Sequence, residues 1–401
     1  MTDCEQSDGK KPRRRRGDGR PTIADVAARA GVGAITVSRA LRDPHLVSEP
    51  LRRNIELAVR ELNYIPSFSA RALARHRSDV VGVLIPSLSQ VVFTDVLRGI
   101  YDGVDGTSLQ VQLANTRYDV LAEERLIETF LRQKPAAMIV SGVDQTPRAR
   151  GVLELAGCPA IQIMDLTTDP IDEVIGFSHV AAGRLMTEHL VDQGYRRIAF
   201  LRGWTSKRAN GRYLGYREAL SAAGLEEPIA ANGAYDNPDA HVADHLQQPV
   251  GLPMRELASA AIGRELLRRA LVADPGLDAV FCNNDIIALG VLFECIARGI
   301  RVPEDLGIAG FNDHEYMAAA EPSLSSVRTP RYESGFEAAM AVRRKLDGET
   351  GGPSVRDLGV QIMARASTNR SGLVERGERP VMPARRRRRQ SSLTGIAAAI
   401  G

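Results

Sequence analysis

The chain has 401 residues, of which 44% are hydrophobic and 25% are charged. This composition is ordinary for a globular protein of two or three domains and excludes disorder throughout. No uncharged apolar run approaches the ~20 residues that a membrane-spanning helix needs, and the N-terminus lacks the apolar stretch of a secretory signal. We therefore expect a cytoplasmic protein.

The formal net charge of +3 is the sum of three unequal parts. Residues 1–80 hold 16 Lys/Arg against 10 Asp/Glu, and residues 371–401 hold 7 against 2. The middle, residues 81–370, holds 29 against 37. Basic ends on an acidic body suggest contact with a polyanion, most often nucleic acid, although basic ends can also serve solubility alone.

Both ends are expected to be disordered. Residues 1–19 are polar, with Gly, Pro and a run of arginines, and we interpret them as a disordered basic arm. Residues 371–401 contain five consecutive arginines at 385–389 and form a disordered basic tail by the same argument.

The cysteines and histidines predict neither a metal site nor a disulfide framework. The four cysteines stand far apart without a CxxC pair, so we expect buried reduced thiols; they are Cys4, Cys158, Cys282 and Cys295. His241 and His245 are four residues apart, but nearby prolines favour a solvated loop. The chain contains no GxSxG, P-loop or HExxH motif, so we expect no enzymatic activity, no metal and no cofactor.

Three short helices are predicted between residues 22 and 62. Thr22 can cap the first, and Gly31-Val32-Gly33 ends it. The second spans about residues 34–41 and ends at Asp43-Pro44. Ser48 caps the third, which carries Pro50 in its first turn. We place this DNA-binding domain at residues 20–66.

The first two helices and their glycine-containing turn have the helix-turn-helix pattern, although a solvated helical hairpin can share it. The first helix would cross the DNA backbone and hold the second in the major groove. Val37, Ala40 and Leu41 are expected to point inward. The side chains on or near the outer face are then Ala34, Ile35, Ser38, Arg39 and Arg42. Arg39 can contact guanine through two hydrogen bonds, and Thr36 and Ser38 can reach phosphates or base edges.

Residues 67–78 are helix-prone but too short to form a stable helix alone. A hinge that folds on DNA would place Leu73 as a wedge in a minor-groove base step. A plain linker is the alternative.

From residue 80 onward, short apolar runs alternate with amphipathic helical stretches. This pattern predicts parallel strands covered on both faces, as in an α/β protein. The expected strands are residues 80–85, 111–114, 137–140, 160–164, 198–201, 279–282 and 307–310. Because about 290 residues are too many for one core, we expect two α/β lobes over residues 79–370.

Several motifs in fixed order resemble the LacI/GalR family of transcriptional regulators, from about residue 22 to residue 368. They include IADVA, TVSR and LNYIP near the N-terminus, and VGVLIPSL, VFCNNDIIALG and VPEDLGIAGFNDHE in the body. Within the family, the chain is most similar to repressors of gluconate operons. The resemblance implies a helix-turn-helix headpiece on a two-lobed, periplasmic-binding-protein-like effector domain. It also implies a homodimer or higher oligomer, a palindromic operator, and a sugar or sugar-acid effector between the lobes. Residues 236–254 diverge from the family pattern.

The resemblance also implies site residues. The DNA-contact candidates are Thr22, Ala34, Ile35, Thr36, Ser38, Arg39, Arg42, Tyr64 and Leu73. The effector-contact candidates are Ser87, Ser89, Phe93, Asp165, Arg212, Asn284, Asn312 and Arg331. Asn312 stands where many sugar-binding members carry Asp.

A polyhydroxylated ligand needs hydrogen-bond donors and acceptors around an apolar wall. Asp165 can accept from hydroxyl groups, and Phe93 offers a flat face. The carboxylate of a sugar acid requires an arginine fork, for which Arg212 and Arg331 are candidates, with Lys207 and Arg208 nearby. The alternatives are structural: an arginine in an ion pair, and Asn284 as a helix cap.

The sequence therefore predicts a repressor whose operator affinity is controlled by a sugar acid, with gluconate as the first candidate. Effector binding would close the cleft, separate the hinge segments and weaken DNA binding. Two alternatives are a regulator of the same family for another sugar or a purine, and a cytosolic sugar-binding or sugar-processing α/β protein.

Overall fold

The computed structural model describes residues 21–65, 77–203, 206–228 and 258–370. It divides into two units, residues 1–78 and 79–401, which we call the headpiece and the effector domain. The expectations for residues 1–19, Leu73 with most of segment 67–78, residues 236–254 and residues 371–401 lie outside the described residues.

The headpiece consists of the three expected helices and a short 3-10 helix. They are α1 (Ile23–Ala30), α2 (Ala34–Arg42), η1 (Pro44–Leu46) and α3 (Glu49–Glu61). Thr22 caps α1 as expected, and Asp25 returns a hydrogen bond to it, which completes a capping box. Gly31 ends α1 in the left-handed conformation, with φ of 68°. Ser48 precedes α3, but its side chain makes no capping hydrogen bond.

A small apolar core holds the three headpiece helices together. Its fully buried members come from all three helices and are Val26, Ala27, Ala30, Val37, Ala40, Ile55 and Ala58. Val37 and Ala40 are buried as expected, and Leu41 packs partly buried against them. This arrangement fixes which face of α2 is left for solvent.

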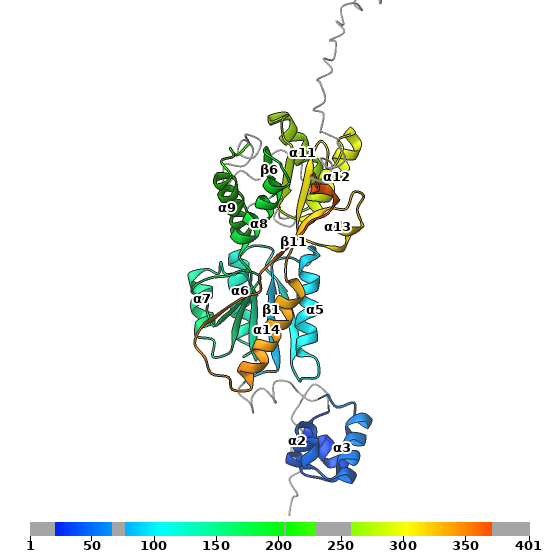
Figure 1. Ribbon diagram of the computed structural model, residues 1–401. Helices are drawn as coiled ribbons and strands as arrows, with labels where there is room; N and C mark the ends of the chain where they lie inside the picture. Colours follow the sequence, from blue (N-terminus) through cyan, green and yellow to red (C-terminus); the bar gives the residue numbers. More distant parts are fainter. Residues whose placement is uncertain (1–20, 66–76, 204–205, 229–257, 371–401) are drawn as a thin grey trace, which may run out of the picture. The chain divides into compact units, whose positions relative to one another are not determined.

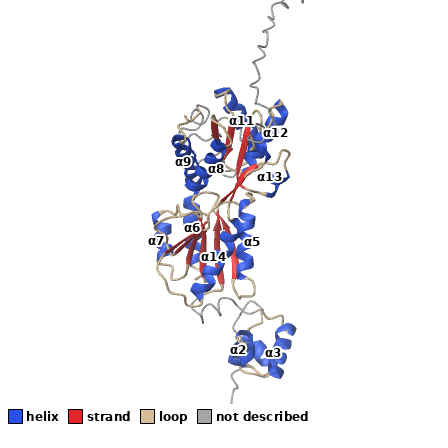
Figure 2. Ribbon diagram, viewed as in Figure 1, coloured by secondary structure: helices blue, strands red, loops and turns tan. Residues whose placement is uncertain are grey.

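The effector domain contains two sheets, each flanked by helices (Figures 1 and 2). The first sheet has the order β10-β5-β4-β3-β1-β2 and is parallel throughout. Its strands are β1 (Val80–Ile85), β2 (Gln110–Asn115), β3 (Ala137–Ser141), β4 (Ala160–Ile163), β5 (Glu173–Gly176) and β10 (Ser354–Asp357). The helices of this lobe are α5 (Val92–Val104), α6 (Val120–Leu131), α7 (Pro147–Glu154) and α14 (Arg331–Leu346).

The second sheet has the order β11-β9-β8-β7-β6. Its strands are β6 (Ile198–Leu201), β7 (Ala279–Cys282), β8 (Gly307–Asn312), β9 (Ser325–Arg328) and β11 (Gln361–Met363), and β11 pairs antiparallel to β9. The helices of this lobe are α8 (His179–Asp192), α9 (Lys207–Ala222), α11 (Ala260–Ala273), α12 (Asp285–Arg298), α13 (Glu315–Ala319) and η4 (Ala366–Thr368).

The chain crosses between the lobes after β5, after β9 and after β10. Each lobe is therefore built from separate stretches of sequence. The α/β architecture and all seven expected strands are present, but β5, β9, β10 and β11 were not expected. These four are only three or four residues long, and each of them contains charged or polar side chains that shorten its apolar run. The expectation of strands covered on both faces is wrong for the edge strand β2, in which no residue is fully buried.

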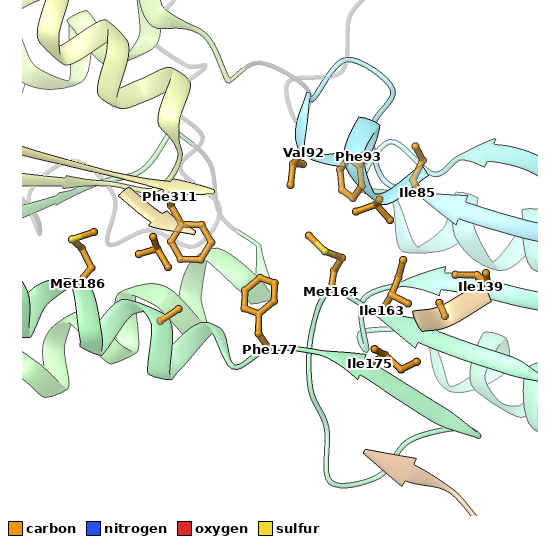
Figure 3. Packing of buried hydrophobic residues seen from close by; sticks show 14 of the residues in the cluster. Ile85, Val92, Phe93, Ile139, Ile163, Met164, Ile175, Phe177, Met186 and Phe311 are labelled. Carbon is orange, nitrogen blue, oxygen red and sulfur yellow. The ribbon is translucent and has the colours of Figure 1, made fainter. Parts of the chain in front are cut away.

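The largest apolar core extends through both lobes (Figure 3). Met164 at the end of β4, Phe177 at the β5 crossover and Phe311 in β8 lie where the lobes meet. The lobes thus contact each other through apolar side chains at the carboxyl ends of their parallel strands, which is where α/β sheets bind ligands.

Within the described residues, no helix is long and apolar enough to cross a membrane. Cys282 and Cys295 are buried free thiols, as expected, whereas Cys158 is only partly buried. The part of the chain that the structure describes also contains no cluster of three or more His, Cys, Asp or Glu residues suited to a metal ion.

Candidate functional site

The solvent face of α2 carries the side chains expected to read DNA. Ala34, Ile35, Ser38 and Arg39 are all exposed, and Ile35 is 79% exposed. Thr36 is partly buried at the edge of this face. The Ile35 side chain is therefore accessible to an apolar group of a partner, such as a thymine methyl.

Two other DNA-contact candidates, Thr22 and Tyr64, lie outside α2. The Thr22 hydroxyl is engaged in the capping box of α1, where it contacts the Asp25 carboxylate at 2.8 Å. Tyr64 is partly buried against the headpiece core. Arg42 is the last residue of α2.

A small cavity lies between the two lobes of the effector domain, and we call it the cleft cavity. Residues at or after the carboxyl ends of several parallel strands and residues of α5, α8 and α9 line it: Gln90, Val92, Phe93, Tyr118, Met164, Phe177, His179, Ser206, Arg208, Arg212, Asn283, Asn284 and Asn312. Its volume is about 40 Å³. Because pockets for small ligands usually measure about 300–1,000 Å³, a sugar-sized molecule requires the lobes or their side chains to move.

Four of the eight effector-contact candidates line the cleft cavity: Phe93, Arg212, Asn284 and Asn312. Ser87 is buried nearby, and its hydroxyl accepts hydrogen bonds from the backbone N–H groups of Ser89 and Gln90. Ser87 and Ser89 therefore shape the turn that presents Gln90 and Phe93. Asp165 directly follows Met164 and is buried, and its Oδ1 accepts from the Leu166 N–H.

Arg212 is held from three sides. Its guanidinium carbon lies 3.8 Å from the centre of the Phe311 ring. Its Nη1 donates to the backbone carbonyl of Asn283 at 2.6 Å, and its Nε donates to Nδ1 of His179 at 3.2 Å. His179 Nε2 lies 3.1 Å from the Met164 carbonyl, so the ring is neutral with its proton on Nε2. Burial and the nearby Arg212 charge lower the pKa of His179 well below its usual value, which agrees with a neutral ring.

Arg208 brings a second guanidinium to the cleft cavity. It is one helical turn before Arg212 on α9, and its Nη2 donates to the Ser141 hydroxyl at 3.1 Å. Burial, followed by repulsion from Arg208, lowers the pKa of Arg212 to about 9. Burial also raises the pKa of the neighbouring Asp165 carboxyl, although Arg208 opposes that shift. Two mutually repelling guanidiniums therefore reach the cleft cavity, and an anion bound between them would reduce that repulsion.

The two asparagines of the cleft also have structural roles. Asn284 caps α12, where its Oδ1 accepts from the Ile287 N–H at 3.1 Å, so the helix-cap interpretation and the cavity position both apply. Asn312 has a φ of 110°, and the cavity residues Tyr118 and Met164 also have positive φ, at 57° and 66°. Backbone strain of this kind in non-glycine residues concentrates at functional sites.

Several residues of the cleft were missed by sequence reasoning. Among the described residues, the buried amide nitrogens Gln90 Nε2 and Asn283 Nδ2 have no hydrogen-bond partner. Both residues line the cleft cavity, where a ligand oxygen would satisfy them. Their position in the sequence could have identified them, because each follows the carboxyl end of a parallel strand, where α/β sheets bind ligands: Gln90, Tyr118, His179 and Asn283.

Arg331 does not line the cleft cavity. Its Nε donates to the Asp95 carboxylate on α5 at 2.9 Å, and its Nη1 donates to the backbone carbonyl of Asn312. Its side chain is 13% exposed. The structure thus shows the ion-pair alternative for Arg331 and adds a link from the first lobe to the second.

A helix-turn-helix headpiece joined to a two-lobed α/β domain with a polar cleft defines a DNA-binding regulator controlled by a small molecule. Comparisons with known proteins agree. Residues 22–67 match the model for bacterial regulatory proteins of the lacI family. Residues 78–249 match the periplasmic binding proteins and sugar binding domain of the LacI family, and residues 187–368 match a periplasmic binding protein-like domain.

The chain is 36% identical over 359 residues to the transcriptional regulator GntR of Pseudomonas aeruginosa, covering 90% of this chain and 99% of the relative. A LacI-family regulator from Silicibacter pomeroyi has a similar structure, with a TM-score of 0.75 and 32% identity over 87% of this chain and all of that one. The lac repressor dimer bound to operator and the anti-inducer ONPF has a TM-score of 0.69 and 26% identity, over 87% of this chain and 99% of that one.

The chain belongs to the LacI family. It is a DNA-binding transcriptional repressor whose second unit has the fold of the family's sugar binding domain.

Proposed function

We propose that this repressor is a homodimer that binds a palindromic operator through α2 and responds to a sugar acid, with gluconate as the first candidate. The observation that carries the effector class is the pair of guanidiniums, Arg208 and Arg212, at the cleft cavity. The similarity to GntR regulators and to repressors of gluconate operons supports the same ligand.

The cleft chemistry favours an acid over a neutral sugar. A neutral sugar would leave two guanidiniums facing each other in a site of low dielectric constant, whereas a carboxylate accepts hydrogen bonds from one or both. The unpartnered amide nitrogens of Gln90 and Asn283 can donate to hydroxyl oxygens of the same ligand. Phe93 and Phe177 supply the apolar wall that the carbon chain needs.

Effector binding must change the structure, because the cleft cavity of about 40 Å³ is too small for a six-carbon acid. The ligand would displace Arg212 from its stacked position on Phe311 or shift the lobes relative to each other. Through the lobes, this change would reach the segment before β1 that joins the effector domain to the headpiece. Weakened operator binding is the proposed result.

The effector is tested by calorimetric titration of the full-length protein with gluconate, related sugar acids, glucose and a purine. We expect saturable binding of gluconate-like acids, and a loss of about tenfold or more in affinity in Arg208→Gln, because a charge-assisted hydrogen bond is removed. Arg217→Gln on the same helix is the matched control, since Arg217 is 60% exposed and pairs with Glu227. Binding of glucose or the purine alone would exclude the sugar acid while leaving the repressor function intact.

The proposed homodimer rests on apolar side chains that α12 leaves exposed. Phe293 is 45% exposed and Ile296 is 62% exposed, and they are three residues apart on one face of the helix. A two-fold axis through such a face would also pair two headpieces on a palindrome. Ile296→Glu is expected to convert the dimer to a monomer in analytical ultracentrifugation, whereas Val272→Glu on the exposed face of α11 should not. A wild-type protein that sediments as a monomer would contradict the proposal.

A further inference from the structure

A second and larger cavity of about 480 Å³ lies at the lobe crossovers, and we call it the hinge cavity. Residues from α5, from the β9–α14 crossover and from the β10–β11 crossover line it. Its volume falls within the range of small-molecule sites, unlike that of the cleft cavity. Its lining residues do not include any residue that lines the cleft cavity.

The hinge cavity is rich in arginine. Arg98, Arg328 and Arg331 reach it from three different elements. Arg98 and Arg331 share a single carboxylate, Asp95, at 3.3 and 2.9 Å. Arg328 pairs with Asp313 at 2.7 Å, and Asp313 also forms an ion pair with Arg365. The cavity lining thus holds three guanidiniums against the two carboxylates of Asp95 and Glu333, which leaves one positive charge in excess at this site.

The walls of the hinge cavity also suit an organic molecule. Pro330, Leu358 and Val360 supply apolar surface, and the guanidinium of Arg98 lies 5.2 Å from the centre of the Tyr332 ring. Guanidinium forks bind carboxylates and phosphates through paired hydrogen bonds. We infer that the hinge cavity binds a small multivalent anion, a polycarboxylate or a phosphorylated metabolite, as a second ligand of this repressor.

The position of the hinge cavity couples it to the cleft. Arg331 donates to Asp95 within the first lobe and to the backbone carbonyl of Asn312 in the second, and Asn312 lines the cleft cavity. An anion that draws Arg331 away from either partner changes a contact between the lobes. Since the crossovers are also where the lobes pivot, the two ligands should alter each other's affinity by the same factor.

The inference is tested by titrating the full-length protein with pyrophosphate and with citrate, in separate calorimetric experiments at constant ionic strength. We expect saturable binding of at least one probe, and the tighter probe identifies the phosphate or the carboxylate class. Arg98→Gln should weaken that binding about tenfold, because it removes a charge-assisted hydrogen bond. Arg98 is 63% exposed and outside the cleft, so this variant should fold and keep its effector affinity.

Arg132→Gln is the matched control, since Arg132 is 79% exposed and pairs with Glu128 on α6. Equal probe affinity in Arg98→Gln and Arg132→Gln would overturn the inference, as would the absence of saturable binding. The Arg208→Gln variant separates the two sites: it should leave probe binding unchanged. Probe binding that disappears in Arg208→Gln and persists in Arg98→Gln would assign the anion to the cleft, whatever the identity of the sugar effector.

Discussion

Arg39 is the residue on which sequence discrimination should depend most strongly. It stands exposed on α2 beside Ser38, with Ile35 on the same solvent side. Arg39→Ala is expected to cost about 1–3 kcal/mol of operator affinity and to relax the preference at one base pair, because a bidentate contact to guanine is lost. Fluorescence anisotropy with operator and random DNA measures both effects. Arg53→Ala on α3 is the control. If Arg39→Ala still discriminated between operator and random DNA as the wild type does, α2 would not be the recognition helix.

Some site residues could be predicted from sequence motifs, and others could not. Motifs identified Arg212, Asn284 and Asn312, which the fold brings to one cavity. They could not show that Arg331 turns toward Asp95, because that contact joins residues 236 positions apart. Nor could they identify His179 as the group that holds Arg212, since its role depends on a ring tautomer fixed by the Met164 carbonyl.

The capping box of α1 gives a prediction at the scale of one element. Thr22→Ala removes the side-chain acceptor for the Asp25 N–H and should destabilise α1 by about 1 kcal/mol. Ser48→Ala is the matched control, because Ser48 makes no capping hydrogen bond at α3. Hydrogen exchange of the α1 amides in the full-length protein should accelerate in the first variant only. Equal exchange rates of the α1 amides in the two variants would show that the capping box does not stabilise α1.

The packing of α5 against α14 depends on glycine. A Cβ at Gly335 would lie 1.9 Å from the backbone oxygen of Val96, so the helices could not approach as they do. Gly335→Ala is expected to lower the free energy of unfolding by about 3 kcal/mol or more, measured by urea denaturation. Gly151→Ala in α7 meets nothing within 4 Å and should be neutral or slightly stabilising. Similar stability of the two variants would show that α5 and α14 can separate at little cost.

Helices α11 and α12 are joined by a carboxylate that three arginines surround. Glu294 accepts hydrogen bonds from Arg264, Arg268 and Arg298, and these contacts, with that from Arg268 largest, lower its pKa to about 2. A lowered carboxyl pKa stabilises the fold above the unfolded value near 4.5, and this stability is lost as the pH falls from 4.5 toward 2. The free energy of unfolding of Glu294→Gln should therefore be about 2 kcal/mol lower than that of the wild type at pH 7, allowing for screening of the half-exposed arginines.

The check on Glu294 is urea denaturation of both proteins at pH 7, 4 and 3. The difference in the free energy of unfolding between wild type and Glu294→Gln should become smaller at each lower pH. A difference that stays constant with pH would mean that the charge of Glu294 contributes nothing and that only its packing matters.

At the scale of the whole molecule, charge divides the chain into basic ends and an acidic body. Deletion of residues 1–19 is expected to weaken binding to operator and random DNA alike and to reduce the dependence of affinity on salt, because phosphate contacts release counterions. Affinities measured from 50 to 200 mM salt on both DNAs provide the test. An unchanged salt slope would limit the arm to a role in solubility.

The global architecture was largely predictable, because apolar runs of four to six residues identify buried strands from local sequence. The pairing of β10 with β5 and of β11 with β9 was not predictable, because both join residues more than 30 positions apart through short, polar edge strands. The lobe boundaries could not be read from the chain for the same reason.

The three crossovers have a consequence for synthesis on the ribosome. The first lobe takes its last helix, α14, and its last strand, β10, from residues 331–357, which are translated after β6 to β9 of the second lobe. The first lobe therefore cannot be completed until residues 331–357 have been synthesised. Until then, the surface of α5 that packs on α14 stays uncovered. A chain truncated before residue 331 would lack both α14 and β10, so the first lobe of the effector domain could not form as it does here.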